Sequence, residues 1–125
     1  MSWQFSNDKA IYLQIMDKIV EGIINGEYPL DSKLPSVREL AADIKVNPNT
    51  VQKAYSELES LNIIAAQSTS GRFVTKDMSL LQSQKDLLIN GHVKDFIDKM
   101  RSLKIEDKQI LNYIKEALKD ESNTN

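Results

Sequence analysis

Residues 47–53, Asn-Pro-Asn-Thr-Val-Gln-Lys, place amide and hydroxyl side chains at the start of a predicted helix. Asn and Gln can hydrogen-bond to adenine through both amide atoms, and Thr can contact a thymine methyl group. Asn49, Thr50 and Gln52 fall on the side of this helix opposite its apolar face. Such residues are typical of a helix that reads base edges in a DNA groove, whereas Asn47 can alternatively act only as a helix cap.

This chain has few of the residue types that commonly carry out catalysis or bind metals. The 125 residues include no Cys and one His, His92, which excludes cysteine zinc sites, thiolate nucleophiles and multi-histidine sites. We interpret His92 as a surface helix residue and the pair Glu106-Asp107 as solvated first-turn residues. No nucleophile–base pair, phosphate loop or metal cluster can be assembled, so we expect no enzyme activity, no cofactor and no metal site.

Two helix-start signals position the polar residues. Ser36 followed by Glu39 has the pattern of a capping box and predicts a helix of about two turns. Asn47 is an N-cap candidate, and Pro48 suits the first position of a helix predicted over 48–61. Two short helices joined by about three residues are typical of a helix-turn-helix.

Other elements flank this pair of helices. Isoleucines recur every four residues and predict an amphipathic helix over 10–25. The dipeptide Lys33-Leu34 precedes a proline and is expected to be extended. Short strands are predicted over 63–67 and 72–75 with a turn between them. A hairpin after a helix-turn-helix makes a winged helix.

The remainder of the chain is predicted to be helical. A first helix reaches Leu103, a turn follows at Lys104-Ile105, and an amphipathic helix is predicted over 106–118. We therefore expect a mainly α fold with a small β-hairpin wing. Residues 1–76 form a winged helix-turn-helix DNA-binding domain in this interpretation, and residues 77–125 form a helical dimerisation domain.

The apolar residues of the C-terminal segment are either an intrachain core or a dimer interface. Two helices alone bury little surface, so an exposed apolar face is expected to seek a partner. We favour the pairing of two identical tails into a homodimer. The residues predicted to form this interface are Leu87, Leu88, Phe96, Ile97, Met100, Leu103, Ile110 and Ile114.

Several spaced motifs resemble the GntR family of bacterial transcription regulators. They are Leu-Pro-Ser-Val-Arg-Glu-Leu-Ala at 34–41, Val-Asn-Pro-Asn-Thr-Val at 46–51, Ala54-Tyr55 with Leu58, and Gly-Arg-Phe-Val at 71–74. The short helical tail is similar to that of the YtrA subfamily, in which the tail serves mainly for dimerisation. The resemblance implies a cytoplasmic, homodimeric regulator, most simply a repressor, that binds a palindromic operator in double-stranded DNA. A small-molecule effector is left open, and no ligand is indicated.

The resemblance also implies which residues bind DNA. Arg38 matches an arginine with which the family contacts DNA, and Gly71 matches the tip of the wing. Pro48 stands where many relatives carry an arginine. The full set of candidate DNA-binding residues is Ser36, Arg38, Asn47, Pro48, Asn49, Thr50, Gln52, Lys53, Gly71 and Arg72.

Structural roles compete with DNA binding at several of these positions. Arg38 can instead pair with Glu39 or Asp43, and Lys53 can simply face solvent. Tyr55 lies at helical spacing with the apolar residues, so we place its ring in the core while its hydroxyl remains a candidate for a phosphate contact.

The charge balance weighs against DNA binding when the whole chain is considered. The formal net charge is −2 and the pI is about 5.4, whereas phosphate neutralisation normally requires a basic excess. Residues 33–76, however, carry six Lys or Arg against four Asp or Glu. This local excess favours DNA binding over the alternative function, a winged-helix module for protein–protein interaction. The absence of a secretory signal at the N-terminus and of a membrane-length apolar run favours the cytoplasm.

Overall fold

Paired capping interactions begin the two helices at the centre of the fold. In the computed structural model, which describes residues 3–123, Ser36 caps α2 (Val37–Ile44) and Asn47 caps α3 (Pro48–Ser60). Both hydrogen bonds of the predicted capping box are formed: Ser36 Oγ accepts from Glu39 N–H, and Glu39 Oε1 accepts from Ser36 N–H. Lys45 ends α2 in the left-handed region at φ 58°, which turns the chain toward α3. The predicted helix-turn-helix is therefore confirmed.

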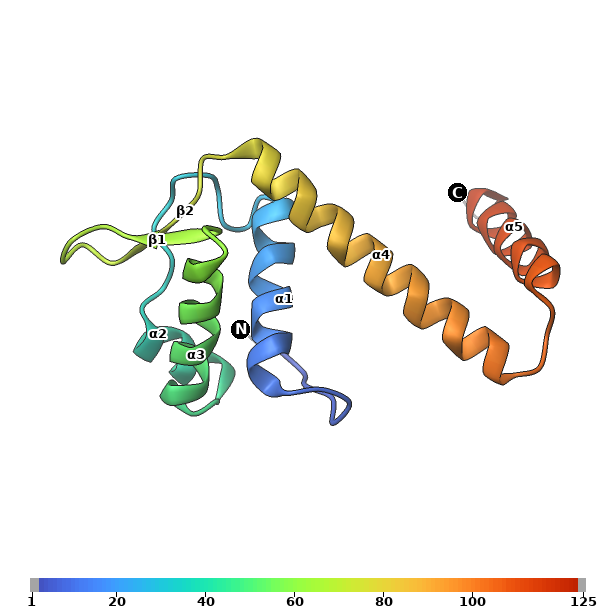
Figure 1. Cartoon of the computed structure of the whole chain (residues 1–125), viewed down its shortest axis with the longest axis horizontal. Helices are drawn as coiled ribbons and strands as arrows, with labels where there is room; N and C mark the ends of the chain where they lie inside the picture. The colour runs from blue at the N-terminus through green and yellow to red at the C-terminus, as the bar shows by residue number, and fades with distance from the viewer. Residues whose placement is uncertain (1–2, 124–125) are drawn as a thin grey trace. The chain divides into compact units, whose positions relative to one another are not determined.

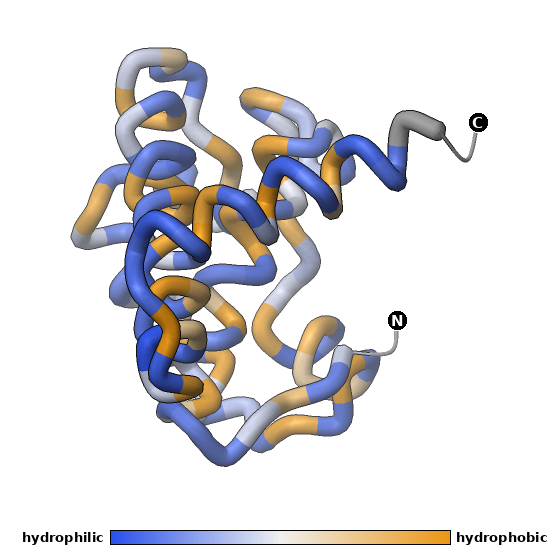
Figure 2. The backbone as a smooth tube through the Cα atoms, turned by 90° about the vertical axis from the view of Figure 1, so that its right-hand side faces the viewer, coloured by the Kyte–Doolittle hydropathy of each residue, from blue (hydrophilic) through white to orange (hydrophobic). Residues whose placement is uncertain are grey.

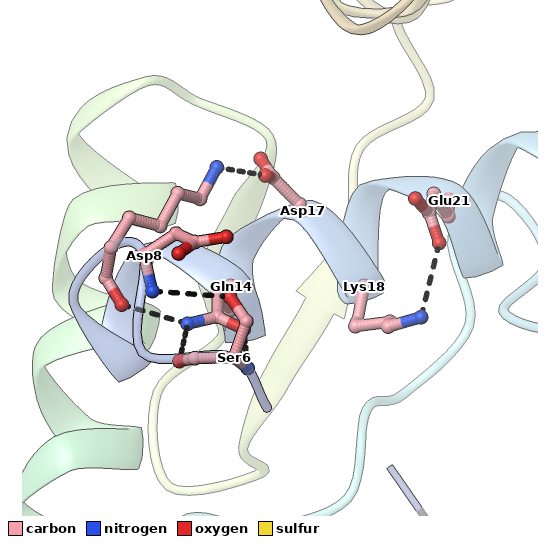
Figure 3. Close-up of polar contacts among 7 residues, drawn as sticks. Ser6, Asp8, Gln14, Asp17, Lys18 and Glu21 are labelled. Atoms are coloured by element: carbon pink, nitrogen blue, oxygen red, sulfur yellow. Dashed lines mark hydrogen bonds and ion pairs between the residues drawn. The ribbon is translucent and has the colours of Figure 1, made fainter. Parts of the chain in front are cut away.

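Helix α1 (Ile11–Ile24) precedes this pair and packs against α3. Ile15, Ile19 and Ile23 are buried, as their spacing predicts. Ala10 offers no side-chain cap, and the segment before the helix is held instead by Gln14. The Gln14 amide donates to Ser6 O at 2.9 Å and to Lys9 O at 2.7 Å, and its oxygen accepts from Ser6 N–H (Figure 3).

The wing is a two-stranded antiparallel hairpin formed by β1 (Ile64–Ala66) and β2 (Arg72–Val74). Ile64 pairs with Val74 and Ala66 with Arg72. The strands are slightly shorter than predicted, because Ile63 N–H bonds back to Leu58 at the end of α3 instead of joining the ladder. Lys33 forms an isolated bridge with Phe73, which confirms the expected extended segment before Pro35.

The core of this part of the chain is made by one face of each element. Helix α3 contributes a fully buried face that packs on α1 and α2, and the hairpin closes one end of it (Figure 1). The buried side chains of α3 and the hairpin are Val51, Ala54, Tyr55, Leu58, Ile63, Ile64 and Val74. The opposite face of α3 is left to solvent.

Helices α4 (Met78–Ser102) and α5 (Asp107–Asn123) complete the chain. The turn between them is at the predicted position, with Lys104 at φ 65°. The predicted end of the last helix at Leu118 is wrong: α5 continues to Asn123, because the residues that follow are polar and include neither glycine nor proline. The mainly helical fold with a two-stranded wing agrees with the predicted class.

The chain divides into two compact units, one up to Asp86 and one from Leu87 onward. The division falls inside α4, whose first turns belong to the first unit and bury Leu81 beside Ile23. The domain boundary predicted after residue 76 stays a prediction. Among residues 3–123, no helix combines the length and apolarity needed to cross a bilayer.

Two buried tyrosines provide a matched test of the core. Tyr55 donates its hydroxyl proton to Pro35 O at 2.7 Å, whereas the buried Tyr28 hydroxyl has no hydrogen-bond partner among the described residues. Tyr55→Phe should therefore lower the free energy of unfolding by about 1–2 kcal/mol, while Tyr28→Phe should leave it unchanged or raise it by up to about 1 kcal/mol. Urea denaturation of both variants measures this difference, and a larger loss for Tyr28→Phe would contradict it.

Candidate nucleic-acid interface

The start of α3 presents its polar residues at the surface. Asn47 Oδ1 accepts from Asn49 N–H at 2.7 Å, so Asn47 is a helix cap as the alternative interpretation predicts. Its amide nitrogen is not used in this contact. Asn47, Pro48 and Asn49 are exposed and Thr50 is half-buried. The backbone N–H groups of Asn49, Thr50 and Val51 all bond to Asn47, so this end of the helix offers its amide and hydroxyl side chains, the groups that bind base edges.

The start of α2 presents Arg38. The side chain is exposed, and among residues 3–123 its guanidinium has no ion-pair partner. The alternative pairing with Glu39 or Asp43 is therefore not formed. Glu39 is committed to the capping box, where the Ser36 N–H and hydroxyl hold its pKa below the ordinary 4.5. Arg38 consequently remains available to an external anion.

A groove of about 390 Å³ lies between the start of α2, the exposed face of α3 and the wing. We call it the wing groove. Five of the ten candidate residues line it, namely Ser36, Arg38, Gln52, Gly71 and Arg72. The other five, Asn47, Pro48, Asn49, Thr50 and Lys53, lie outside it on the first turns of α3. The candidates thus form two groups, one around α3's first turn and one in the wing groove.

Arg72 is the most constrained side chain of the wing groove. Its Nε donates to the Glu59 carboxylate on α3, and its guanidinium carbon lies 5.3 Å from the centre of the Tyr55 ring. Its Nη2 also lies 3.5 Å from Gln52 Oε1, at the long limit of a hydrogen bond. The contacts hold β2 of the wing against α3.

Tyr55 belongs to the core, as predicted, and its hydroxyl does not reach the surface. The residue has 0% exposure and its proton is given to Pro35 O. Burial raises the pKa of the hydroxyl, so the group stays protonated and continues to donate. A phosphate contact by this hydroxyl is thereby excluded.

Two lysines differ in how they are held. Lys53 Nζ lies 4.2 Å from the centre of the Tyr12 ring, so this exposed ammonium has a cation–π contact with α1 and does not simply face solvent. Lys33 lines the wing groove, and its side chain passes close to Gly71. Gly71 adopts φ 112°, a backbone conformation that L side chains rarely adopt, which explains the glycine at this position.

Sequence reasoning overlooked three residues of the wing groove. Lys33, Thr69 and Ser70 line it but carried no functional prediction. For Lys33, the sequence did contain an indication: it stands just before Leu34-Pro35, where the chain is expected to be extended. This extended backbone brings the lysine beside the wing. The two wing-tip residues had no comparable signal, because a Thr-Ser pair is typical of any exposed turn.

The predicted dimerisation residues lie on α4 and α5, except Leu103, which follows the end of α4. Ile110 is buried, Leu88, Ile97, Met100 and Ile114 are half-buried, and Leu87, Phe96 and Leu103 are exposed. A groove of about 810 Å³ between the two helices, which we call the tail groove, is lined mainly by apolar side chains that include Phe96, Ile97, Ile110 and Ile114. Arg101 closes the turn with two hydrogen bonds to the Asp107 carboxylate, at 3.0 and 2.9 Å. His92 is exposed at the edge of the groove, in line with its surface assignment.

Comparison with known proteins identifies relatives that span most of the chain. The pattern of the bacterial regulatory proteins of the gntR family matches residues 11–74. The chain is 38% identical over 115 residues to the HTH-type transcriptional regulator YhcF of Bacillus subtilis (strain 168), covering 92% of this chain and 95% of that protein. It is 36% identical over 111 residues to the HTH-type transcriptional repressor YtrA of the same organism, covering 88% and 85%. A solved GntR family transcriptional regulator from Listeria monocytogenes matches with TM-score 0.78 and 36% identity over 90% of this chain and 98% of that one.

The capping box that orients Ser36 and Arg38 should respond to pH. Because the folded pKa of Glu39 is lowered, its contribution to stability is present above the unfolded value of 4.5 and is lost as pH falls through the folded value. NMR titration should find the Glu39 carboxyl pKa below 4.5, and Ser36→Ala should raise it toward that value. A Glu39 pKa in the wild-type protein that Ser36→Ala leaves unchanged would contradict the capping box.

Proposed function

Because this chain belongs to the GntR family of bacterial DNA-binding transcriptional regulators, close to its short YhcF- and YtrA-type members, we propose that it is a repressor that binds a palindromic operator as a homodimer. As a member of this family it is a regulator and not an enzyme. The observation that carries the repressor assignment is the match to YtrA, itself named a transcriptional repressor, along 88% of this chain. Because members of this family bind DNA, DNA binding is also favoured over the alternative function of a protein–protein interaction module.

In this proposal the first turns of α3 enter the major groove. Asn49, Thr50 and Gln52 contact base edges, because their amide and hydroxyl groups match the donors and acceptors that bases present there. Asn47 lies near a phosphate, because the helix-cap contact uses its side-chain oxygen and leaves its amide nitrogen to donate. Pro48 has no N–H to offer and serves mainly to start the helix.

The cations fix the protein on the DNA backbone. Arg38 at the start of α2 binds a phosphate, and its exposure without an internal partner supports this role. Lys33, which lines the wing groove with Gln52, and the exposed Lys53, which follows Gln52 on α3, contribute further positive charge. With a local charge of only +2 over residues 33–76, we expect weak non-specific affinity and selectivity that rests on the amide and hydroxyl contacts.

The tail groove supports dimerisation by a second copy of this chain. Leu87 and Leu103 do not line the groove, but they expose 65% and 70% of their surface and add apolar area for a partner to cover. Apolar residues also recur along α5 as it runs to the C-terminus (Figure 2). Residues 78–125 carry eight charges of each sign, so charge repulsion does not oppose self-association.

Homodimerisation explains how a small domain reaches useful specificity. A twofold dimer places two α3 helices on successive major grooves about 34 Å apart and therefore favours a palindromic site. The protein acts in the cytoplasm, where it meets the chromosome. The proposal leaves room for a small-molecule effector but names no ligand. Such an effector regulates DNA binding only if it binds the DNA-free and DNA-bound states with different affinity.

Arg38→Ala tests the phosphate contact. Loss of one phosphate contact should weaken binding to an operator selected from random duplex DNA and reduce the slope of log Kd against log salt by about 1. The matched control is Lys18→Ala, which removes one positive charge from α1, where Lys18 pairs with Glu21 at 3.9 Å (Figure 3). An Arg38→Ala slope equal to that of wild type would remove Arg38 from the interface.

The double variant Phe96→Asp/Leu103→Asp tests the tail. A carboxylate on each exposed apolar position should convert the dimer into a monomer, because charge is costly to bury in an apolar interface. Light scattering measures the mass, and Leu61→Asp, at a 43% exposed leucine after α3, is the control that should remain dimeric. A double variant that stays dimeric would show that the subunits associate elsewhere.

A further inference from the structure

Gln52 is held at both ends of its amide group before any DNA binds. Its Nε2 donates to Ser56 Oγ one turn along α3, at 3.0 Å. Its Oε1 faces Arg72 Nη2 on the wing, at 3.5 Å. The two contacts give the amide a definite orientation, with the oxygen toward the wing and the nitrogen toward the C-terminal end of α3.

Arg72 is itself unable to act as a free cation. Its side chain is 25% exposed, and the Glu59 carboxylate that pairs with it is 32% exposed. The guanidinium also lies against the Tyr55 ring, which is fixed in the core. Moving Arg72 to a phosphate would break the ion pair and leave a partly buried carboxylate beside the DNA, which is electrostatically unfavourable.

We propose that Arg72 is a positioning residue which, anchored by Glu59, sets the side chain of Gln52 for base recognition and does not bind a phosphate itself. This inference rests on the proposed function in one respect, that Gln52 contacts a base. It revises the sequence-based expectation that Arg72 belongs to the DNA-binding residues. Its consequence is that base preference at one position of each half-site depends on Glu59 and Arg72, neither of which touches DNA.

The geometry requires an arginine and not merely a positive charge. The planar guanidinium offers Nε to Glu59 and Nη2 to Gln52 while its face covers Tyr55. A lysine ammonium is a single point charge on a flexible stem and cannot make these three contacts together. Arg72→Lys therefore retains the charge and removes the positioning.

The test uses full-length protein and the duplex that the wild type selects from a random pool, together with every single-base variant of that duplex. Gln52→Ala identifies the base pair that Gln52 reads as the one where discrimination falls. Arg72→Lys should reduce discrimination at the same base pair by about 5-fold or more, since a good bidentate contact discriminates by roughly that factor upward. Its slope of log Kd against log salt should equal that of wild type.

Glu59→Gln supplies the opposite charge change. It should also reduce discrimination at the Gln52 base pair, yet raise overall affinity, because a negative charge near the DNA is removed and Arg72 is released. A folding defect cannot raise affinity, so this readout separates positioning from general damage. The matched control is Glu57→Gln on the exposed surface of the same helix, which should leave discrimination unchanged.

Three outcomes would overturn the inference. Full discrimination in Arg72→Lys, combined with a slope reduced by about 1 in Arg72→Ala, would make Arg72 a phosphate contact. A Glu59→Gln protein with wild-type discrimination would show that the anchor has no effect on Gln52. Unchanged base preference in Gln52→Ala would remove the base contact, while operator binding and the Arg38→Ala and tail variants would still test the repressor proposal independently.

Discussion

The buried ring of Tyr55 is the contact on which the geometry of the wing groove depends. Its hydroxyl donates to Pro35 O, one residue before the Ser36 cap of α2, and its ring face receives the Arg72 guanidinium from β2. One residue of α3 therefore fixes both the start of α2 and the wing relative to α3. Burial raises the pKa of the hydroxyl, which keeps the donated hydrogen bond in place over the whole physiological pH range.

An acidic chain can bind DNA because charge acts locally. Although the formal charge is −2, the exposed cations Lys33 and Arg38 line the same groove as Gln52, and the exposed Lys53 follows Gln52 on α3. Salt screens charges farther than about 8–10 Å from the phosphates, so distant acidic residues have little effect on binding. The wing carries one cation, Arg72, and its pairing with Glu59 neutralises that charge, so DNA binding depends less on overall charge attraction and more on specific contacts.

The two compact units differ in how completely they bury their apolar side chains. In the first unit, α1, α2, α3 and the hairpin bury one another's apolar faces, with Ile15, Val51 and Leu58 fully enclosed. In the second, α4 and α5 leave the apolar tail groove open and several leucines exposed. Such a surface is stable in water when another apolar surface covers it, which is the physical reason for proposing that a second copy of the chain binds there.

The sequence by itself determined the local structure. The capping box of Ser36 and Glu39, the Asn47 cap with Pro48, and the four-residue spacing of Ile15, Ile19 and Ile23 all act within one or two helical turns, so their consequences can be read without a fold. The same locality explains the error at the end of α5, since a polar sequence without glycine or proline marks no definite stop.

Tertiary structure alone decided which side chains meet. Arg72 and Gln52 are 20 residues apart and Arg72 and Glu59 are 13 apart, and no helical or strand period relates such positions. The roles of Lys33 in the wing groove and of the Tyr55 hydroxyl likewise depend on which segments pack together. A residue's type and spacing thus indicated the chemistry it can perform. Its partners followed from the packing of distant segments, and these partners decide between binding DNA and positioning another residue.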